Sequence, residues 1–174
     1  SWWDALPELL TDATYQGESA TDESGARLLW NGGLGSSSRC LGMLECYHLM
    51  RDSSEFTPEL HSKILKIFLG HSRYIYDNHV QEYSPSNFQA TAACWLVTAG
   101  IMLPEFTESG QWLKTAVERL KERVDRNFEP DGAQIEQCPQ YHLAGMRDLA
   151  RPILLMQLND CDAVSGDANL WQKL

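Results

Sequence analysis

Apolar residues recur every three or four positions through most of this chain, the spacing that places them on one face of an α-helix. The clearest example is residues 109–127, where one face is apolar and the opposite face carries charged side chains. The apolar positions of this segment are Trp112, Ala116, Val117, Leu120 and Val124. The alternation of apolar and polar residues that is typical of a β-strand is hard to find anywhere. The pattern therefore predicts an all-α fold.

Helix start and stop signals predict four more helices. They are expected at residues 36–51, 57–75, 87–103 and 140–158. The first follows a glycine-rich turn at residues 31–35, and the serines after that turn are expected to cap the helix. The second has Thr57 as its cap and Pro58 at the first helical position. In the last, Pro152 is expected to start a new helix or to kink the existing one.

The length of 174 residues is enough for one domain with a core of its own. No period of roughly 30 to 50 residues repeats along the sequence, so a solenoid with a strong consensus is not supported. Long helical hairpins without a sequence repeat fit an (α/α) toroid, in which inner and outer helices alternate. We expect a single all-α domain over residues 1–174, made of helical hairpins that form an incomplete part of such a toroid.

Charge and hydropathy exclude two classes of partner. The formal net charge is −10 and no basic stripe is present, which argues against a nucleic-acid partner. The same acidity mildly opposes a polyanionic ligand, because the overall field repels it. The longest apolar stretch, residues 90–103, is interrupted by Thr91, Thr98 and Gly100 and falls short of a membrane span. No signal peptide is visible at the start of the chain.

The cysteines suggest neither a disulfide framework nor a metal site. The five are Cys40, Cys46, Cys94, Cys138 and Cys161. An odd number cannot all pair within the chain, and none belongs to a CxxC motif or to a Cys/His cluster with zinc-like spacing. They are expected to be mostly small buried apolar residues. We therefore expect no cofactor in this segment.

Two polar residues on separate predicted helical segments carry the most informative chemistry. Asn87 offers a side-chain amide and Tyr141 a phenol, and an amphipathic helix joins their segments. This pairing suits the removal of a proton next to a sugar carboxylate. The amide would stabilise the charge that develops on the carboxylate, and the phenol would move the proton. A phenol ordinarily titrates at about 10, so a base role needs a nearby cation or hydrogen-bond donor.

Each candidate also has a structural interpretation. Tyr141 fits a core tyrosine with a satisfied hydroxyl, and Asn87 fits a helix cap. Glu136 is either a solvated loop carboxylate or a group that orients site residues. His71 lies on an apolar helical face, where a packed core histidine is expected in preference to a catalytic one.

Several residues occur in an order that is itself informative. In chain order they are Pro104-Glu105-Phe106, Trp112, Asp131-Gly132, Glu136 and Tyr141-His142. This set resembles the helical domain of the heparinase II/III and alginate lyase families of polysaccharide lyases. Asn87 takes the position of an Asn that opens an inner helix in these families. Tyr141 follows it by 54 positions, which is similar to the family's spacing.

The resemblance implies a lyase that cleaves a uronic-acid-containing polysaccharide by β-elimination, with Tyr141 and Asn87 as catalytic residues. Substrate binding is expected from Glu136, His142, Trp30 and Arg39. An acidic polysaccharide or oligosaccharide is then the expected partner, and the expected location is secreted or periplasmic. Relatives can carry a structural divalent metal ion, although no ligand cluster in this segment demands one.

Three departures from the family pattern bear on these expectations. Phe88 stands where the family usually has His, and it can neither donate a hydrogen bond nor take a proton. Gly35 falls where relatives often carry an Arg, and Arg39, one helical turn later, is the candidate to replace it. The family's β-sandwich domain, which supplies another catalytic His, is not found within residues 1–174. We therefore expect part of a toroid whose apolar faces favour self-association.

Two other functions remain open. A non-catalytic carbohydrate-binding or structural helical domain is favoured by Phe88 and by the absent second domain. An (α/α)-toroid glycoside hydrolase would need paired carboxylates, and Glu136 has only Asp131 close to it in sequence. The polysaccharide itself is not identified, and the acidic charge balance favours non-sulfated uronates.

Overall fold

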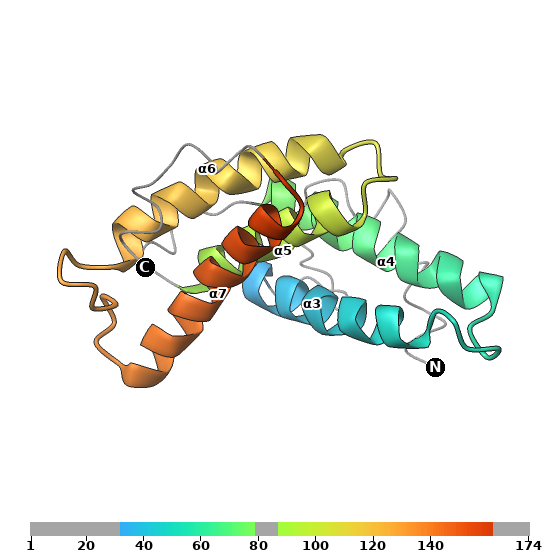
Figure 1. Ribbon diagram of the computed structural model, residues 1–174, viewed down its shortest axis with the longest axis horizontal. Coiled ribbons are helices and arrows are strands. Elements are labelled where there is room, and N and C mark those ends of the chain that lie inside the picture. The colour runs from blue at the N-terminus through green and yellow to red at the C-terminus, as the bar shows by residue number, and fades with distance from the viewer. Residues whose placement is uncertain (1–31, 79–86, 162–174) are drawn as a thin grey trace, which may run out of the picture. The chain divides into compact units, whose positions relative to one another are not determined.

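The computed structural model describes residues 32–78 and 87–161, and every regular element in these ranges is a helix. The helices are α3 (Gly32–Met50), α4 (Pro58–Asp77), α5 (Asn87–Met102), α6 (Ser109–Asn127) and α7 (Pro139–Leu158) (Figure 1). Within the same ranges, β-type pairing is limited to an isolated bridge between Phe128 and Gln134. None of these helices is long and apolar enough to cross a lipid bilayer. The prediction of an all-α fold is confirmed.

The chain divides into two compact units, and the first contains α3 and α4. An aromatic cluster closes the connection between these two helices. Tyr47 of α3 lies edge-on to Phe56 in the connecting segment, with ring centroids 5.6 Å apart, and to His61 of α4 at the same separation. The Tyr47 hydroxyl also lies 3.2 Å from Nε2 of His61. The cluster fixes the register of the α3–α4 hairpin.

The start of α3 differs from the prediction, whereas the start of α4 agrees with it. The predicted glycine-rich turn is wrong over Gly32–Gly35, because α3 already begins at Gly32. Ser37 is buried inside the helix, where its hydroxyl donates to the carbonyl of Gly33 four residues earlier. The segment is helical despite the low helix propensity of glycine, and the buried Ser36 and Ser37 follow it directly. Helix α4 begins as predicted, with the Thr57 hydroxyl accepting a hydrogen bond from the backbone N–H of Leu60 at 3.2 Å.

The second unit is built around α5, which contacts both α6 and α7 (Figure 1). Small residues make up much of α5, and nearly all of its side chains are buried. A helix that is buried on all sides forms the centre of a core. Helix α7 continues through Pro152, so no new helix starts there. The buried α5 thereby sets the positions of the two helices that surround it.

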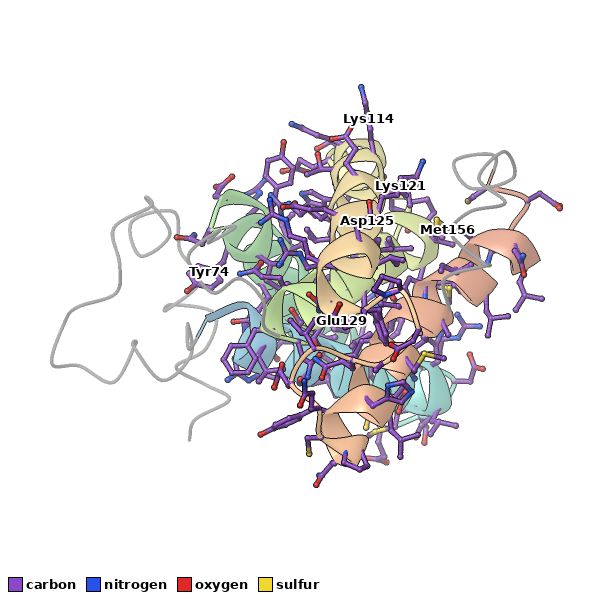
Figure 2. The ribbon with its side chains drawn as sticks, turned by 90° about the vertical axis from the view of Figure 1, so that its left-hand side faces the viewer. Tyr74, Lys114, Lys121, Asp125, Glu129 and Met156 are labelled. Atoms are coloured by element: carbon purple, nitrogen blue, oxygen red, sulfur yellow. The ribbon has the colours of Figure 1, made fainter. Side chains whose placement is uncertain are left out.

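Helix α6 has the two faces that its sequence predicts, except that the charged Arg123 is buried. Trp112, Ala116, Val117, Leu120 and Val124 are all buried. Lys114 and Asp125 are exposed, and Figure 2 shows Lys114 extending away from the helix. The predicted amphipathic helix is confirmed at residues 109–127.

A close helix contact at Gly100 gives a prediction about stability. A Cβ atom added at Gly100 would lie 2.8 Å from Cβ of Leu113 and 2.9 Å from the carbonyl oxygen of Ser109. Gly100→Ala is therefore expected to lower the free energy of unfolding by about 1–3 kcal/mol, since α6 must move to relieve the overlap. Gly110→Ala is the matched control, because nothing lies within 4 Å of the added atom. Equal stability of the two variants in urea denaturation would contradict the packing described here.

The cysteines follow the prediction only in part. Cys40 and Cys94 are buried, Cys138 and Cys161 are partly exposed, and Cys46 is exposed. All five thiols are free. Burial, with a smaller contribution from the charge of Asp148, raises the pKa of Cys94 to about 12. Such a thiol stays protonated at neutral pH, which excludes Cys94 as a thiolate nucleophile.

Candidate active site

A tight turn after α6 brings the chain back beside the end of that helix. The Asp131 carboxylate accepts a hydrogen bond from the Ala133 N–H at 3.0 Å, and Gly132 has a φ of 84° that favours glycine. The backbone N–H of Ile135 then donates to the carbonyl of Asn127 at 3.0 Å. The turn therefore holds Gln134 inward, against the base of α5 and α7, and it uses Asp131 for this structural purpose.

Gln134 is the centre of the site, and sequence reasoning did not single it out. Its side chain is 1% exposed. Its Oε1 accepts from the backbone N–H of Glu136 at 2.8 Å, and its Nε2 donates to Oε1 of Glu136 at 3.2 Å. The same Nε2 donates to Oδ1 of Asn87 at 3.4 Å. Gln134 thus joins two of the predicted site residues, Asn87 and Glu136, which come from separate segments.

His142 joins the same group through the backbone of Gln134. The Gln134 N–H donates to Nδ1 of His142 at 3.3 Å. Because a backbone N–H can only donate, Nδ1 is the acceptor and the ring proton lies on Nε2. The imidazole also packs edge-on against Phe128, with ring centroids 5.9 Å apart. His142 is therefore held in one tautomer, with Nε2–H as its remaining donor.

Tyr141 lies in the first turn of α7 and is 49% exposed. The alternative of a buried core tyrosine is therefore wrong. Its hydroxyl makes no hydrogen bond to any described residue, unlike the neighbouring His142. The two adjacent side chains point in different directions, as expected for consecutive helical residues. The Tyr141 phenol is thus accessible to a ligand at the end of the helix where His142 contacts Gln134.

Gly145 allows α7 to pass close to Asn87. A Cβ atom at this position would lie 3.3 Å from Oδ1 of Asn87 and 3.4 Å from Cζ of Phe128. Gly145 is one helical turn after Tyr141, so the same turn of α7 that carries the phenol is the one that approaches the amide. Because Gly145 has no side chain, α7 can lie close to Asn87 at the start of α5.

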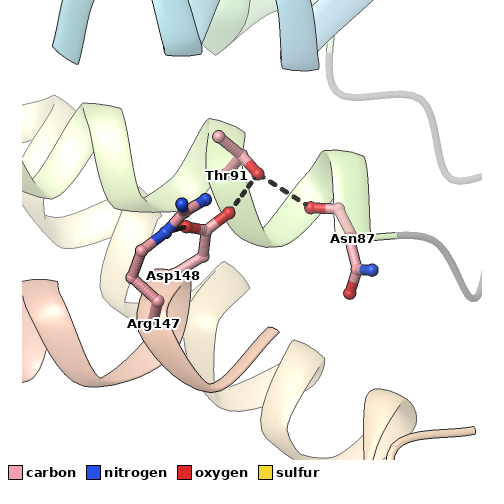
Figure 3. A network of polar contacts seen from close by, with 4 residues as sticks. All are labelled: Asn87, Thr91, Arg147 and Asp148. Atoms are coloured by element: carbon pink, nitrogen blue, oxygen red, sulfur yellow. Dashed lines mark hydrogen bonds and ion pairs between the residues drawn. The ribbon is translucent and has the colours of Figure 1, made fainter. Parts of the chain in front are cut away.

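A second polar network fixes the start of α5 on α7 (Figure 3). The Thr91 hydroxyl contacts both the Asp148 carboxylate and the backbone carbonyl of Asn87, the latter at 3.1 Å. Asp148 is 3% exposed, and its other oxygen accepts from Nε of Arg147 at 2.9 Å. The hydrogen bond from Arg147 to Asp148 raises the pKa of Arg147, so the guanidinium stays charged. The side-chain amide of Asn87 points away from Thr91 in the same view (Figure 3).

The capping role considered for Asn87 receives no support from these contacts. Its side-chain oxygen accepts from Gln134 and not from a backbone N–H of the first turn of α5. The alternative in which Glu136 orients other residues agrees with the structure, since Glu136 contacts Gln134 through both its backbone and its side chain.

Arg39 belongs to the other unit, on α3, where it is held by His71 of α4. Nη1 of Arg39 lies 2.7 Å from Nε2 of His71, and Nδ1 of His71 lies 3.0 Å from the carbonyl oxygen of Ile67. Because a carbonyl can only accept, Nδ1 carries the proton and Nε2 accepts from Arg39. His71 is fully buried, as predicted for a core histidine. The other predicted substrate-binding residue, Trp30, lies outside the described residues.

The buried His71 gives a prediction about pH. Burial first, and the charge of Arg39 second, lower the pKa of His71 from 6.5 to about 4. Between these two pH values the unfolded chain takes up a proton that the folded chain does not, so acid favours unfolding. The free energy of unfolding is expected to fall by about 3 kcal/mol between pH 7 and pH 4 through this group.

His71→Gln tests the assignment, since an amide can also accept from Arg39 and donate to Ile67 without titrating. In urea denaturation at several pH values, this variant should depend less on pH between 6.5 and 4 than the wild type. His61→Gln, which leaves His71 in place, is the control. An unchanged pH dependence in His71→Gln would show that another group is responsible.

Among the described residues, no three or more His, Cys, Asp or Glu side chains form a group that could hold a metal ion. The glycoside hydrolase alternative paired Glu136 with Asp131, but the Asp131 carboxylate accepts from the Ala133 N–H and closes the turn. The site brings together the side-chain amides of Asn87 and Gln134, the His142 imidazole and the Glu136 carboxylate, with the Tyr141 phenol adjacent in sequence to His142.

Comparison with known families identifies the class of protein. The family description of the heparinase II/III N-terminus matches residues 7–167. This chain belongs to that family, as the ordered set of residues around Tyr141 predicted.

Individual relatives agree with this assignment. The chain is 26% identical over 137 residues to a heparin-sulfate lyase of Bacteroides stercoris, covering 79% of this chain and 20% of that protein. It is 28% identical over 123 residues to a heparin-sulfate lyase of Bacteroides thetaiotaomicron, covering 71% of this chain and 17% of that protein. The chain thus spans about a fifth of the length of these relatives.

A crystal structure of heparinase III matches the fold with a TM-score of 0.79 and 22% sequence identity. The match covers 99% of this chain and 25% of that one. Heparinase III has an α-toroid fold, so the prediction of an all-α chain that forms part of a helical toroid is confirmed.

Proposed function

We propose that this chain contributes to a polysaccharide lyase that cleaves a uronic-acid-containing polysaccharide by β-elimination. The observation that carries the proposal is the group around Gln134, which joins Asn87, Glu136 and His142 through hydrogen bonds next to the exposed Tyr141. The family and the names of the relatives support the same reaction class.

The Asn87 amide and the Tyr141 phenol have different roles in the elimination. The carbon–hydrogen bond beside the sugar carboxylate breaks, and Tyr141 takes up this proton. A carbon–carbon double bond forms while the bond to the neighbouring glycosidic oxygen breaks. Tyr141 returns a proton to that oxygen, so the reaction consumes no water and no redox partner. Asn87 donates a hydrogen bond to the carboxylate, on which negative charge increases in the transition state.

Glu136 and His142 are proposed to bind the substrate or to hold the residues that do. Their contacts with Gln134 fix both at the edge of the site. Arg39 and Trp30 are proposed as further substrate contacts, with Arg39 offering a charge-assisted hydrogen bond to a carboxylate or a sulfate. We further propose a secreted or periplasmic location and self-association through exposed apolar side chains, which include Leu143 and Leu158 of α7.

A carbohydrate-binding domain without catalysis is the second candidate, and Phe88 favours it. This residue follows Asn87 on α5, is 44% exposed and has a side chain that cannot move a proton. An exposed aromatic ring can contact the apolar face of a sugar. This candidate predicts saturable binding of uronic-acid oligosaccharides without any product.

The test is the ultraviolet absorbance of the unsaturated uronate product, measured on heparan sulfate, alginate, hyaluronan and glucuronan. Heparan sulfate comes first because the relatives are named heparin-sulfate lyases. A rise with any of these polymers supports the lyase and identifies its substrate. Binding without a rise supports the second candidate, and new reducing ends without a rise would indicate hydrolysis.

A further inference from the structure

We propose that Gln134 is a positioning residue that determines which end of the Asn87 amide faces the substrate. This inference rests on the proposed lyase function for its catalytic consequence. Its structural part concerns only the hydrogen bonds among Asn87, Gln134 and Glu136. These contacts assign Gln134 a role that neither the family match nor the names of the relatives describe.

The orientation of the Gln134 amide is fixed by Glu136. The backbone N–H of Glu136 can only donate, so the Gln134 atom 2.8 Å from it must be the oxygen. The Gln134 nitrogen then lies on the opposite side, 3.2 Å from the Glu136 carboxylate. Turning the amide over would place two donors face to face and an oxygen against a carboxylate. At a side chain that is 1% exposed, water cannot offset these two unfavourable contacts.

The orientation of the Asn87 amide follows from that of Gln134. The Gln134 nitrogen donates to Oδ1 of Asn87 at 3.4 Å, so the oxygen end of the Asn87 amide is occupied. Gly145 leaves room for that oxygen, which a side chain at position 145 would press upon. Nδ2 is the end that remains, and it donates no hydrogen bond to any described residue. The donor end of the amide is thus the one available to a ligand.

This arrangement matches the chemistry of the proposed substrate. A carboxylate accepts hydrogen bonds and is repelled by an amide oxygen. An Asn87 amide turned the other way would therefore oppose binding and would destabilise the developing charge. Glu136 fixes Gln134, and Gln134 in turn fixes Asn87. Since Gln134 need not touch the substrate, it acts through Asn87.

Gln134→Glu is the variant that reverses the orientation. Glutamate keeps the side-chain length and still accepts from the Glu136 N–H, but it places an oxygen against the Glu136 carboxylate and offers Asn87 an acceptor in place of a donor. The Asn87 amide is expected to turn and donate to it. Gln134→Met removes the donor without adding charge, which separates the orientation from simple repulsion of the substrate. Gln157→Glu, at an exposed position of α7, is the matched control for the change from amide to carboxylate.

The structural part is tested without substrate by the side-chain amide signals of Asn87 in ¹⁵N-resolved nuclear magnetic resonance, assigned by their loss in Asn87→Asp. In Gln134→Glu these signals should shift and their hydrogen exchange should slow, because Nδ2 becomes bonded to a buried carboxylate. Gln157→Glu should leave them unchanged. Unchanged Asn87 signals in folded Gln134→Glu would overturn the inference, whatever the activity.

The catalytic part is tested by the kinetics of double-bond formation. We expect kcat to fall by about 10- to 100-fold in both Gln134→Glu and Gln134→Met, with wild-type kinetics in Gln157→Glu. A merely structural role would reduce the folded fraction and leave kcat per folded molecule unchanged, and this result would overturn the catalytic part. An inactive wild type on every polymer would instead count against the proposed function, while the resonance experiment would still decide the orientation.

Discussion

Tyr141→Phe is expected to lower the rate of double-bond formation by about 10²- to 10⁴-fold, the range that general acid–base catalysis contributes. The change removes one hydroxyl and leaves the ring in place. Because that hydroxyl bonds to no described residue and the side chain is 49% exposed, the fold should not change. Stability should stay within about 0.5 kcal/mol of the wild type. Loss of activity without loss of stability would mark the phenol as the group that moves the proton.

The control for this variant is Tyr47→Phe in the first unit. The Tyr47 hydroxyl lies 3.2 Å from Nε2 of His61, so its removal should cost about 1 kcal/mol of stability and no activity. The same chemical change should therefore lower activity but not stability in Tyr141→Phe, and stability but not activity in Tyr47→Phe. A Tyr141→Phe protein that keeps most of its turnover would remove Tyr141 from the mechanism. The reaction would then need another acid and base.

Asn87→Ala is the second large expected effect, a fall in kcat of about 10²- to 10³-fold. This is the cost of removing one donor from a developing negative charge. KM should change much less, because the hydrogen bond strengthens most in the transition state. The Gln134 nitrogen loses one acceptor but keeps the Glu136 carboxylate at 3.2 Å, so the turn should survive the substitution. Steady-state kinetics on the polymer that gives the product will measure both parameters.

Asn87→Asp and Asn159→Ala complete that experiment. Aspartate can still accept from Gln134, but it turns a negative charge toward the substrate carboxylate, and the loss should be at least as large as in Asn87→Ala. Asn159 lies at the exposed end of α7, where its amide donates to the carbonyl of Leu155 at 2.8 Å, and its replacement should leave kcat unchanged. A rise in KM alone in Asn87→Ala would show that Asn87 only binds the substrate.

The sequence alone predicts those helices that have a local cap signal or a clear apolar stripe. Thr57 and Pro58 predict the start of α4, and the apolar stripe from Trp112 to Val124 predicts the buried face of α6. The predicted start of α3 was wrong, because glycine normally marks a turn, whereas Gly32–Gly35 already belong to α3. Local propensity fails where tertiary contacts decide the outcome.

The candidate site likewise contains residues that the sequence predicts and one that only the folded structure reveals. Asn87 and Tyr141 are predicted from their chemistry and from the family resemblance, and Glu136 and His142 from their places in the same ordered set. Gln134 was missed because a single amide in a turn has no periodic signal, and its role arises only when the chain folds back.

Thr91 and Asp148 carry a weaker sequence signal for a contact between their helices. Thr91 is one helical turn after Asn87 in an otherwise apolar stretch, and Asp148 is two turns after Tyr141. Polar residues at core positions of two helices suggest that the helices bond to each other. The sequence gives no means of knowing which pair would meet, because that depends on how α5 and α7 pack.

Gly145 has a consequence for any attempt to make this protein more heat-resistant. Replacing helical glycines with alanine is a common route to greater stability, since glycine costs a helix about 1 kcal/mol relative to alanine. Gly42 and Gly110 are open to that change, because nothing lies within 4 Å of the added carbon. At Gly145 the same carbon would lie 3.3 Å from Oδ1 of Asn87. At this one position of α7 the higher helix propensity of alanine is therefore opposed by a contact with Asn87, and relief of that contact would move the proposed catalytic amide.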